Sequence, residues 1–156
     1  MLCYIDINRI GGFFMRVEQI SVLLRNEPGV LSKILGTISN GDINILGLTI
    51  NETAAFGELR LIVNDTQKTR ELLEKIDISH NIVKVIVVKL PDRPGELLKI
   101  ASLLSDYDIN IDYIYTLSSG RKFAFVVIKS WDMPATQEIL LEKEIEIVSI
   151  EEILSN

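Results

Sequence analysis

The chain has 156 residues, of which 47% are hydrophobic and 24% charged, so we expect a folded protein with a real core. Sixteen Lys and Arg against 22 Asp and Glu give a net charge of −6, which argues against nucleic acid or an anionic membrane as a partner. One cysteine and one histidine leave little for a zinc site or a histidine-dependent acid–base centre. Composition therefore disfavours catalysis, and we expect neither a metal nor a cofactor.

Residues 1–14 are expected to be a short N-terminal extension. They have neither the charged start nor the small-residue cleavage site of a secretory signal, and Met15 directly precedes the first strand pattern. No apolar run approaches the roughly 20 residues that cross a bilayer. We therefore expect a cytoplasmic protein.

A first unit is predicted over residues 15–82, in the order strand, helix, strand, strand, helix, strand. Val17 to Leu24 is rich in β-formers, and Pro28-Gly29 ends that run where a helix can begin. The helix that follows has one apolar face, formed by Val30, Leu31, Ile34, Leu35 and Ile38. Two further strands are predicted at Ile43 to Ile50 and Gly57 to Val63, and the second helix is capped by Asp65 or Thr66.

A second unit, over residues 83–156, repeats the first. The segment Glu27-Pro28-Gly29-Val30-Leu31 recurs as Arg93-Pro94-Gly95-Glu96-Leu97, an offset of 66 residues (93 − 27), and Asp42-Ile43-Asn44-Ile45 recurs as Asp108-Ile109-Asn110-Ile111. Such a long repeat indicates a duplicated small domain rather than a solenoid. A last strand is predicted within Ile145 to Ile153. The order of elements is the ferredoxin-like βαββαβ arrangement, an α+β fold.

One row of side chains differs between the two copies. At the offset of 66, the charged positions Glu58 and Arg60 become Ala124 and Val126, and Ile128 continues the apolar row. An apolar row on a face that should be wet usually marks a buried interface, so Ala124, Val126 and Ile128 are predicted to form one, most simply in a homodimer. The alternative is deeper burial within the same chain.

The loop between the first strand and the first helix of each unit is the candidate binding site. Backbone N–H groups and the positive end of the helix dipole favour a carboxylate there, and glycine allows close approach. Asn44 and Asn110 open the next strand and offer amide donors and acceptors. Together these groups suit a free amino acid. The candidate ligand-binding residues are Asn26, Gly29, Val30, Leu31, Asn44, Asp92, Arg93, Pro94, Gly95, Glu96, Leu97 and Asn110.

The loop sequences Asn26-Glu27-Pro28-Gly29-Val30-Leu31 and Asp92-Arg93-Pro94-Gly95-Glu96-Leu97, each followed by Asp-Ile-Asn-Ile, resemble the ACT-domain family. Members are small regulatory modules attached to aspartokinases, chorismate-pathway enzymes and other amino-acid enzymes. The resemblance covers residues 17–153 and is nearest to the stand-alone tandem form, also through Phe56 to Val63 and the pair Tyr113 and Tyr115. It implies two units side by side in one eight-stranded antiparallel sheet with helices on one face, and effector pockets at unit or subunit interfaces.

In that family the ligand is usually an amino acid, held by the strand–helix loop and the start of the second strand. The second loop matches the pattern better, because it has Asp92 where the first has Asn26, and Arg93 can pair with a carboxylate. We expect Asp92 to face the ligand amine and the backbone of Gly95 to Leu97 to face its carboxylate. The alternative is that Asp92 is a helix cap and Arg93 a solvated charge.

The sequence thus predicts a non-catalytic regulatory or sensor protein that binds a small amino acid. The alternative is an interaction subunit without a ligand, which docks on a partner metabolic enzyme and regulates it. A small enzyme is disfavoured, because the sequence has no nucleophile–base pair, metal-ligand cluster or phosphate-binding glycine loop.

Overall fold

The computed structural model describes residues 15–25, 27–52, 56–117 and 122–155. The expected N-terminal extension and Asn26 lie outside these ranges. The elements follow one another as β1 (Val17–Arg25), α1 (Val30–Asn40), β2 (Ile45–Glu52), β3 (Phe56–Val63), α2 (Thr66–Lys75), β4 (His80–Pro91), α3 (Glu96–Asp106), β5 (Ile111–Thr116), β6 (Phe123–Ser130), α4 (Met133–Glu142) and α5 (Ile150–Leu154). This order confirms the prediction of a duplicated α+β unit.

The described strands form one antiparallel sheet of six strands in the order β2-β3-β1-β4-β6-β5, so the expectation of eight strands is wrong. One reason is that β4 serves both units. Its first half pairs with β1, from Val85 back to His80, and its second half pairs with β6, from Ile86 to Pro91. The expected unit boundary between residues 82 and 83 lies inside this continuous strand.

The other reason is that the last predicted strand does not form. The strand predicted within Ile145 to Ile153 is reduced to a single bridge between Val88 and Ile147. Ser149 then starts α5, because its side chain accepts from the Glu152 N–H and the Glu152 carboxylate accepts from the Ser149 N–H. This reciprocal capping favours a helix where the apolar pattern favoured a strand.

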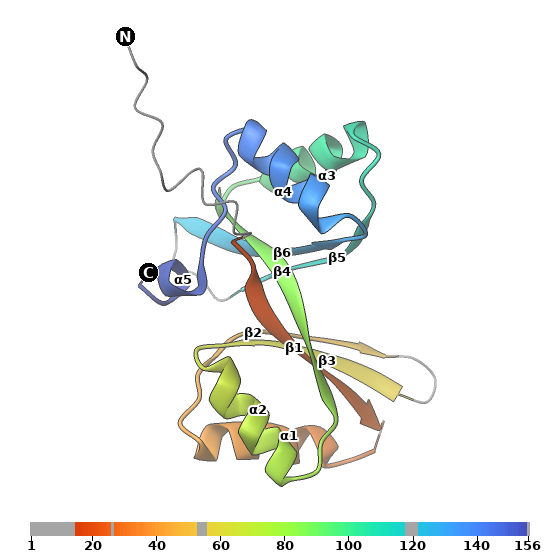
Figure 1. The fold of residues 1–156 in the computed structure, drawn as a ribbon, viewed down its shortest axis with the longest axis vertical. Coiled ribbons are helices and arrows are strands. Elements are labelled where there is room, and N and C mark those ends of the chain that lie inside the picture. Colours follow the sequence, from red (N-terminus) through yellow and green to blue (C-terminus); the bar gives the residue numbers. More distant parts are fainter. Residues whose placement is uncertain (1–14, 26, 53–55, 118–121, 156) are drawn as a thin grey trace.

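Helices α1 to α4 lie on one face of the strands, whereas α5 packs on the other face through Ile153, and the sheet is curled. Ile82 of β4 packs with α1 and α2, whereas Ile86 and Val88, on the same side of that strand, pack with α3 and α4. The two helix pairs lie at opposite ends of the molecule with the sheet between them (Figure 1). The faces turned away from these four helices therefore meet in a third apolar cluster, to which α5 adds Ile153. Its other buried members are Val17, Ile62, Val85, Val87, Leu117, Phe125, Val127 and Val148.

The apolar row at Ala124, Val126 and Ile128 belongs to the helix-facing core of the second unit. Val126 and Ile128 are fully buried there, and Ala124 packs against the same cluster. Strand β5 starts 66 residues after β2 (111 − 45), whereas β6 starts 67 residues after β3 (123 − 56). The hairpin of the second unit is therefore one residue longer than that of the first. A shift of one residue exchanges the two faces of a strand.

The predicted interface is therefore corrected to burial within the same chain. Phe125 and Val127, rather than Ala124 and Val126, are the counterparts of the charged pair Glu58 and Arg60. The argument for a homodimer rested on this row and loses its support.

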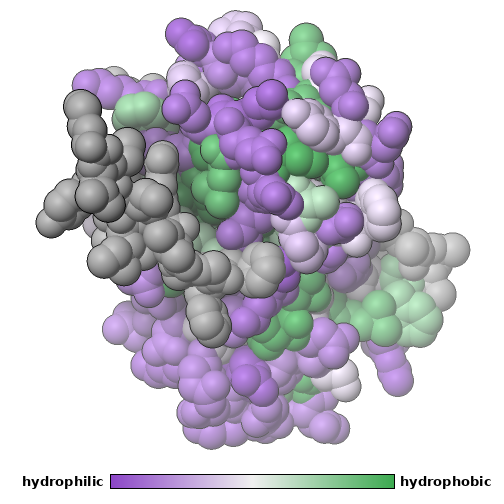
Figure 2. Space-filling view, turned by 45° about the horizontal axis from the view of Figure 1, so that its top comes forward, coloured by the Kyte–Doolittle hydropathy of each residue, from purple (hydrophilic) through white to green (hydrophobic). Residues whose placement is uncertain are grey.

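Hydrophilic side chains cover most of the surface that the space-filling view presents, and apolar side chains reach it in separate groups (Figure 2). The large exposed apolar residues include Leu23, Leu97, Leu98 and Trp131. No helix within the described residues is both long and apolar enough to cross a membrane.

Candidate functional site

Glycine caps the first helix of each unit in a left-handed conformation. Gly29 precedes α1 with φ of 89°, and Gly95 precedes α3 with φ of 92°. L-residues with a side chain rarely adopt this region, which is why the sequence turns at Pro-Gly in both copies. A Cβ at either glycine would meet no atom within 4 Å, so the space over both loops is open.

The N-terminus of α3 keeps its backbone donors. Gly95 supplies no side-chain cap, and the first helical bond runs from the Lys99 N–H to the Gly95 carbonyl oxygen at 3.1 Å. Among the described residues, no hydrogen bond is found for the N–H groups of Glu96, Leu97 and Leu98. These donors, together with the helix dipole, can bind an anion.

A cavity of about 120 Å³ lies beside this helix end. Its walls include four of the predicted residues, Asp92, Arg93, Glu96 and Leu97. Thr116, at the end of β5, joins them and was missed from the sequence, because its position depends on the pairing of Thr116 with Val126 on β6. The floor is formed by Leu90, Pro91, Ala124 and Val126.

Charges at this cavity are already partly paired. The Oε1 atom of Glu96 accepts from Arg93 Nε at 2.6 Å and from Lys99 Nζ at 2.9 Å. The hydrogen bonds from Lys99 and Arg93 lower the pKa of Glu96, even though its burial acts in the opposite direction. Arg93 is therefore not a free solvated charge, although its terminal nitrogens still carry donors beyond the bond made by Nε.

Asp92 is not the cap of α3, since that position is occupied by Gly95. Its backbone N–H donates to the Lys122 carbonyl oxygen at 3.1 Å, which ties the loop to the start of β6. Asp92 is one of the residues that line the cavity, and it is exposed. A carboxylate in this position can accept from a ligand ammonium.

The structure does not bring Asn44 and Asn110 to the loops. Arg25, at the loop end of β1, pairs with Phe56 at the start of β3, whereas Ile45, next to Asn44, pairs with Val63 at the end of β3. The eight residues of β3 place these two ends roughly 23 Å apart.

Both asparagines instead join strands at the far end of each unit. The Asn44 N–H donates to Asn64 Oδ1 at 2.9 Å, and the Asn110 carbonyl oxygen accepts from the Trp131 N–H at 3.4 Å. Of the remaining predicted residues, Val30 and Leu31 pack against the first core, and Pro94 is exposed in the second loop.

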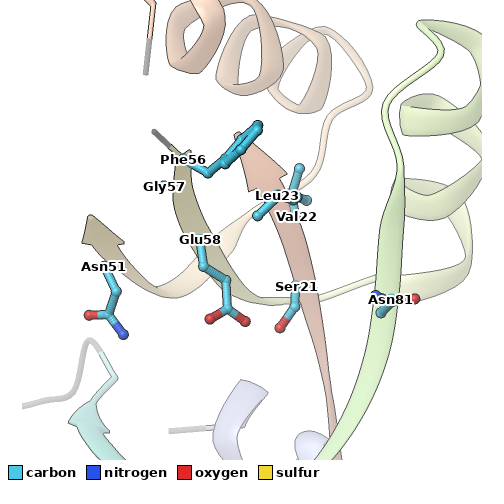
Figure 3. Close-up of a pocket in the computed structure, with 8 residues that line it drawn as sticks. All are labelled: Ser21, Val22, Leu23, Asn51, Phe56, Gly57, Glu58 and Asn81. Atoms are coloured by element: carbon cyan, nitrogen blue, oxygen red, sulfur yellow. The ribbon is translucent and has the colours of Figure 1, made fainter. Parts of the chain in front are cut away.

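A second and larger hollow, of about 480 Å³, lies on the first unit. Figure 3 shows its lining residues on β1, β2, β3 and β4, with the Glu58 and Ser21 side chains directed to the same region. No sequence pattern pointed to it, because its residues come from four strands. They are Ser21, Val22, Leu23, Asn51, Phe56, Gly57, Glu58 and Asn81.

A buried polar contact joins the two units next to this hollow. Gln19 of β1 is fully buried, and its Nε2 donates to Tyr113 Oη at 2.9 Å while its Oε1 accepts from Tyr115 Oη at 2.9 Å. The Arg60 guanidinium lies over the Tyr113 ring at 3.9 Å. The charged pair Glu58 and Arg60 of the first unit thus faces the tyrosine pair of the second.

The described residues contain no group of three or more His, Cys, Asp or Glu side chains that could hold a metal ion.

Comparison with known proteins gives two kinds of match. A family model described as an ACT domain pair matches residues 15–156. The solved structure of a protein from Bacteroides thetaiotaomicron is 32% identical, with a TM-score of 0.83 over 89% of this chain and 96% of that one. A search of curated proteins gave no match.

More distant structures share the fold alone. The ligand-free regulatory subunit of aspartate kinase from Thermus thermophilus is 15% identical, with a TM-score of 0.58 over 83% of this chain and 93% of that one. The corresponding subunit from Thermus flavus is 14% identical, with a TM-score of 0.57 over 90% and 94%.

Proposed function

Since the chain belongs to the ACT domain pair family, we propose that it is a regulatory protein that binds a small amino acid at the loop before α3. The observation that carries this proposal is the cavity at Asp92 and Arg93, into which the uncapped N-terminus of α3 opens. The same cavity holds an acceptor for an ammonium group and donors for a carboxylate. A free amino acid has both groups on one carbon.

Each group of the ligand has a partner in this cavity. The ligand carboxylate accepts from the N–H groups of Glu96 and Leu97, where the helix dipole adds to the attraction. The terminal nitrogens of Arg93 donate to the same carboxylate. The ammonium group donates to Asp92 and to the Thr116 hydroxyl.

The size and charge of the cavity limit the choice of amino acid. A volume of about 120 Å³ has room for roughly four to ten non-hydrogen atoms, judged by the space that a water molecule needs. Asp92 and Glu96 already supply two carboxylates, so an acidic side chain on the ligand would be repelled. We therefore expect a small neutral amino acid.

A thermal-shift screen over the twenty amino acids tests the proposal. A ligand that binds only the folded chain raises its stability, by about 2.7 kcal/mol at a concentration of 100 times Kd. At least one small neutral amino acid should raise the melting temperature in a saturable way. If none does so at millimolar concentration, the chain is not an amino-acid sensor.

The second candidate function is an interaction subunit that regulates a partner enzyme. It is favoured by Leu97 and Leu98, which are 47% and 69% exposed at the start of α3. A stoichiometric metabolic enzyme recovered with the chain, together with an empty amino-acid screen, would favour this function over the first.

A further inference from the structure

The hollow on the first unit is built by strand register. Leu23 of β1 lies opposite Glu58 of β3, and Glu58 lies opposite Asn51 of β2. In the next row, Ser21 of β1 lies opposite Asn81 of β4. Because directly opposed residues share a face of a sheet, all these side chains project from the face that is turned away from the helices. This cavity is therefore separate from the one at Asp92, which lies on the helix side of the second unit.

The lining combines an apolar wall with polar groups. Leu23 is 63% exposed and Phe56 45% exposed, and both border the hollow. The polar groups are the Glu58 carboxylate, the amides of Asn51 and Asn81, and the Ser21 hydroxyl. No lysine or arginine is among the described lining residues, and the single formal negative charge, on Glu58, is paired with Arg60 just outside the lining.

Glu58 has capacity for a further partner. Its Oε2 atom accepts from Arg60 at 2.6 Å, and 40% of the Glu58 side chain is exposed. An ionised carboxylate has about four acceptor positions, so Oε1 can accept from a ligand without loss of the Arg60 pair. Arg60 itself is only 8% exposed and lies over Tyr113, so it cannot swing into the hollow without leaving that ring.

We propose that this hollow binds a small primary amine with an apolar tail. The ammonium group donates to Glu58 and to the amide oxygen of Asn51, which lies directly opposite Glu58, and the tail packs on Leu23 and Phe56. A volume of about 480 Å³ is within the range of small-molecule sites, which are mostly apolar with a few placed polar groups. An amine fits better than an amino acid, because a ligand carboxylate would lie beside the Glu58 carboxylate, while Arg60 is only 8% exposed and lies outside the lining.

The site has a direct connection to the contact between the units. Glu58 is bonded to Arg60, which covers Tyr113 of the second unit, and Ser21 Oγ accepts from Gln19 Nε2 at 3.0 Å. A bound ammonium group shares the Glu58 carboxylate with Arg60, which keeps its bond to Oε2. Occupancy should therefore change the environment of the Tyr113 ring, which belongs to the other unit.

Nuclear magnetic resonance of the ¹⁵N-labelled chain tests this site with isopentylamine as the probe. Isopentylamine should give saturable shifts of the Asn51 side-chain amide. Isopentanol, which has the same apolar tail and no charge, should give none, and leucine should bind more weakly because of its carboxylate. The proposal is overturned if the amine leaves the Asn51 amide unmoved, or if isopentanol or leucine binds as tightly.

Two variants separate the site from a general effect of charge. Glu58→Gln should weaken amine binding roughly tenfold or more, since a charge-assisted bond is lost, whereas Glu142→Gln, at an exposed carboxylate on α4, should leave it unchanged. Leu23→Lys places a tethered ammonium opposite Glu58 at an exposed position, and should block the free amine while the chain stays folded. Equal binding by wild type and Leu23→Lys would overturn the proposal. The outcome does not depend on the amino-acid screen, since the two cavities share no lining residue.

Discussion

Replacing Gln19 with leucine should destabilise the chain by breaking the polar contact between its units. Gln19 is fully buried and makes three hydrogen bonds, to Ser21, Tyr113 and Tyr115, each of 2.9 or 3.0 Å. A net value of about 1 kcal/mol per bond gives a loss of about 2–3 kcal/mol in the free energy of unfolding. Leucine fills most of the vacated volume, so no large cavity term is added.

Urea denaturation, monitored by far-ultraviolet circular dichroism, measures this loss of unfolding free energy. In a thermal melt, the melting temperature should fall by about 5–10 °C for a chain of this size. Gln67→Leu is the control, because Gln67 is exposed on α2 and its side chain bonds to Glu71 of the same helix. It should change stability by less than about 0.5 kcal/mol.

A double-mutant cycle assigns the loss to the contact itself. Gln19→Leu and Tyr115→Phe remove opposite ends of one hydrogen bond, so their effects should be non-additive by about 1 kcal/mol. If Gln19→Leu costs no more than the Gln67 control, or if the two changes add fully, the polar contact does not hold the units together.

Three further changes test other parts of the structure. Gly95→Ala should cost about 1–2 kcal/mol of unfolding free energy, measured in urea, because φ of 92° strains a residue with a Cβ although the space is open; no loss would contradict the left-handed cap. Burial raises the pKa of Tyr115 above its ordinary value of 10.0, so the folded chain keeps that proton longer than the unfolded chain, and stability should decline as the pH rises above 10. Tyr115→Phe should flatten that decline in melts at increasing pH, and an unchanged slope would contradict the burial. Val126→Asp should cost more than about 3 kcal/mol and leave the chain largely unfolded by circular dichroism, since it buries an unpaired carboxylate; a folded, soluble variant would contradict the core position.

The sequence was sufficient to predict the order of the elements and the loops at which α1 and α3 begin. The apolar spacing from Val30 to Ile38 marked one helix, and the repeated Pro-Gly marked both helix starts, where the structure has left-handed glycines. These features depend on neighbours in the chain, so a local pattern can reveal them.

Features that depend on register were not predictable in the same way. A single added residue in the hairpin before β6 exchanged the faces of that strand and moved Val126 from the predicted interface to the core. The repeat at 66 residues gave no sign of this, because its matching segments end at Ile45 and Ile111, before the hairpin.

The direction of each strand determines which of the predicted site residues lie close together. Asn44 and Asn110 follow the loop residues closely in the repeat, but each helix returns the chain to the other end of its sheet. Thr116 was missed for the same reason, since only the pairing of β5 with β6 brings it to Asp92.

The central claim is that an amino acid binds at the loop before α3, and isothermal titration calorimetry of Asp92→Asn tests it most directly. With the small neutral amino acid found in the screen, wild type should give saturable heat, and Asp92→Asn should lose roughly tenfold or more in affinity because the ammonium loses its charged acceptor. Asp106→Asn, at an exposed carboxylate at the far end of α3, should bind as wild type does. Undiminished binding by Asp92→Asn would contradict the account.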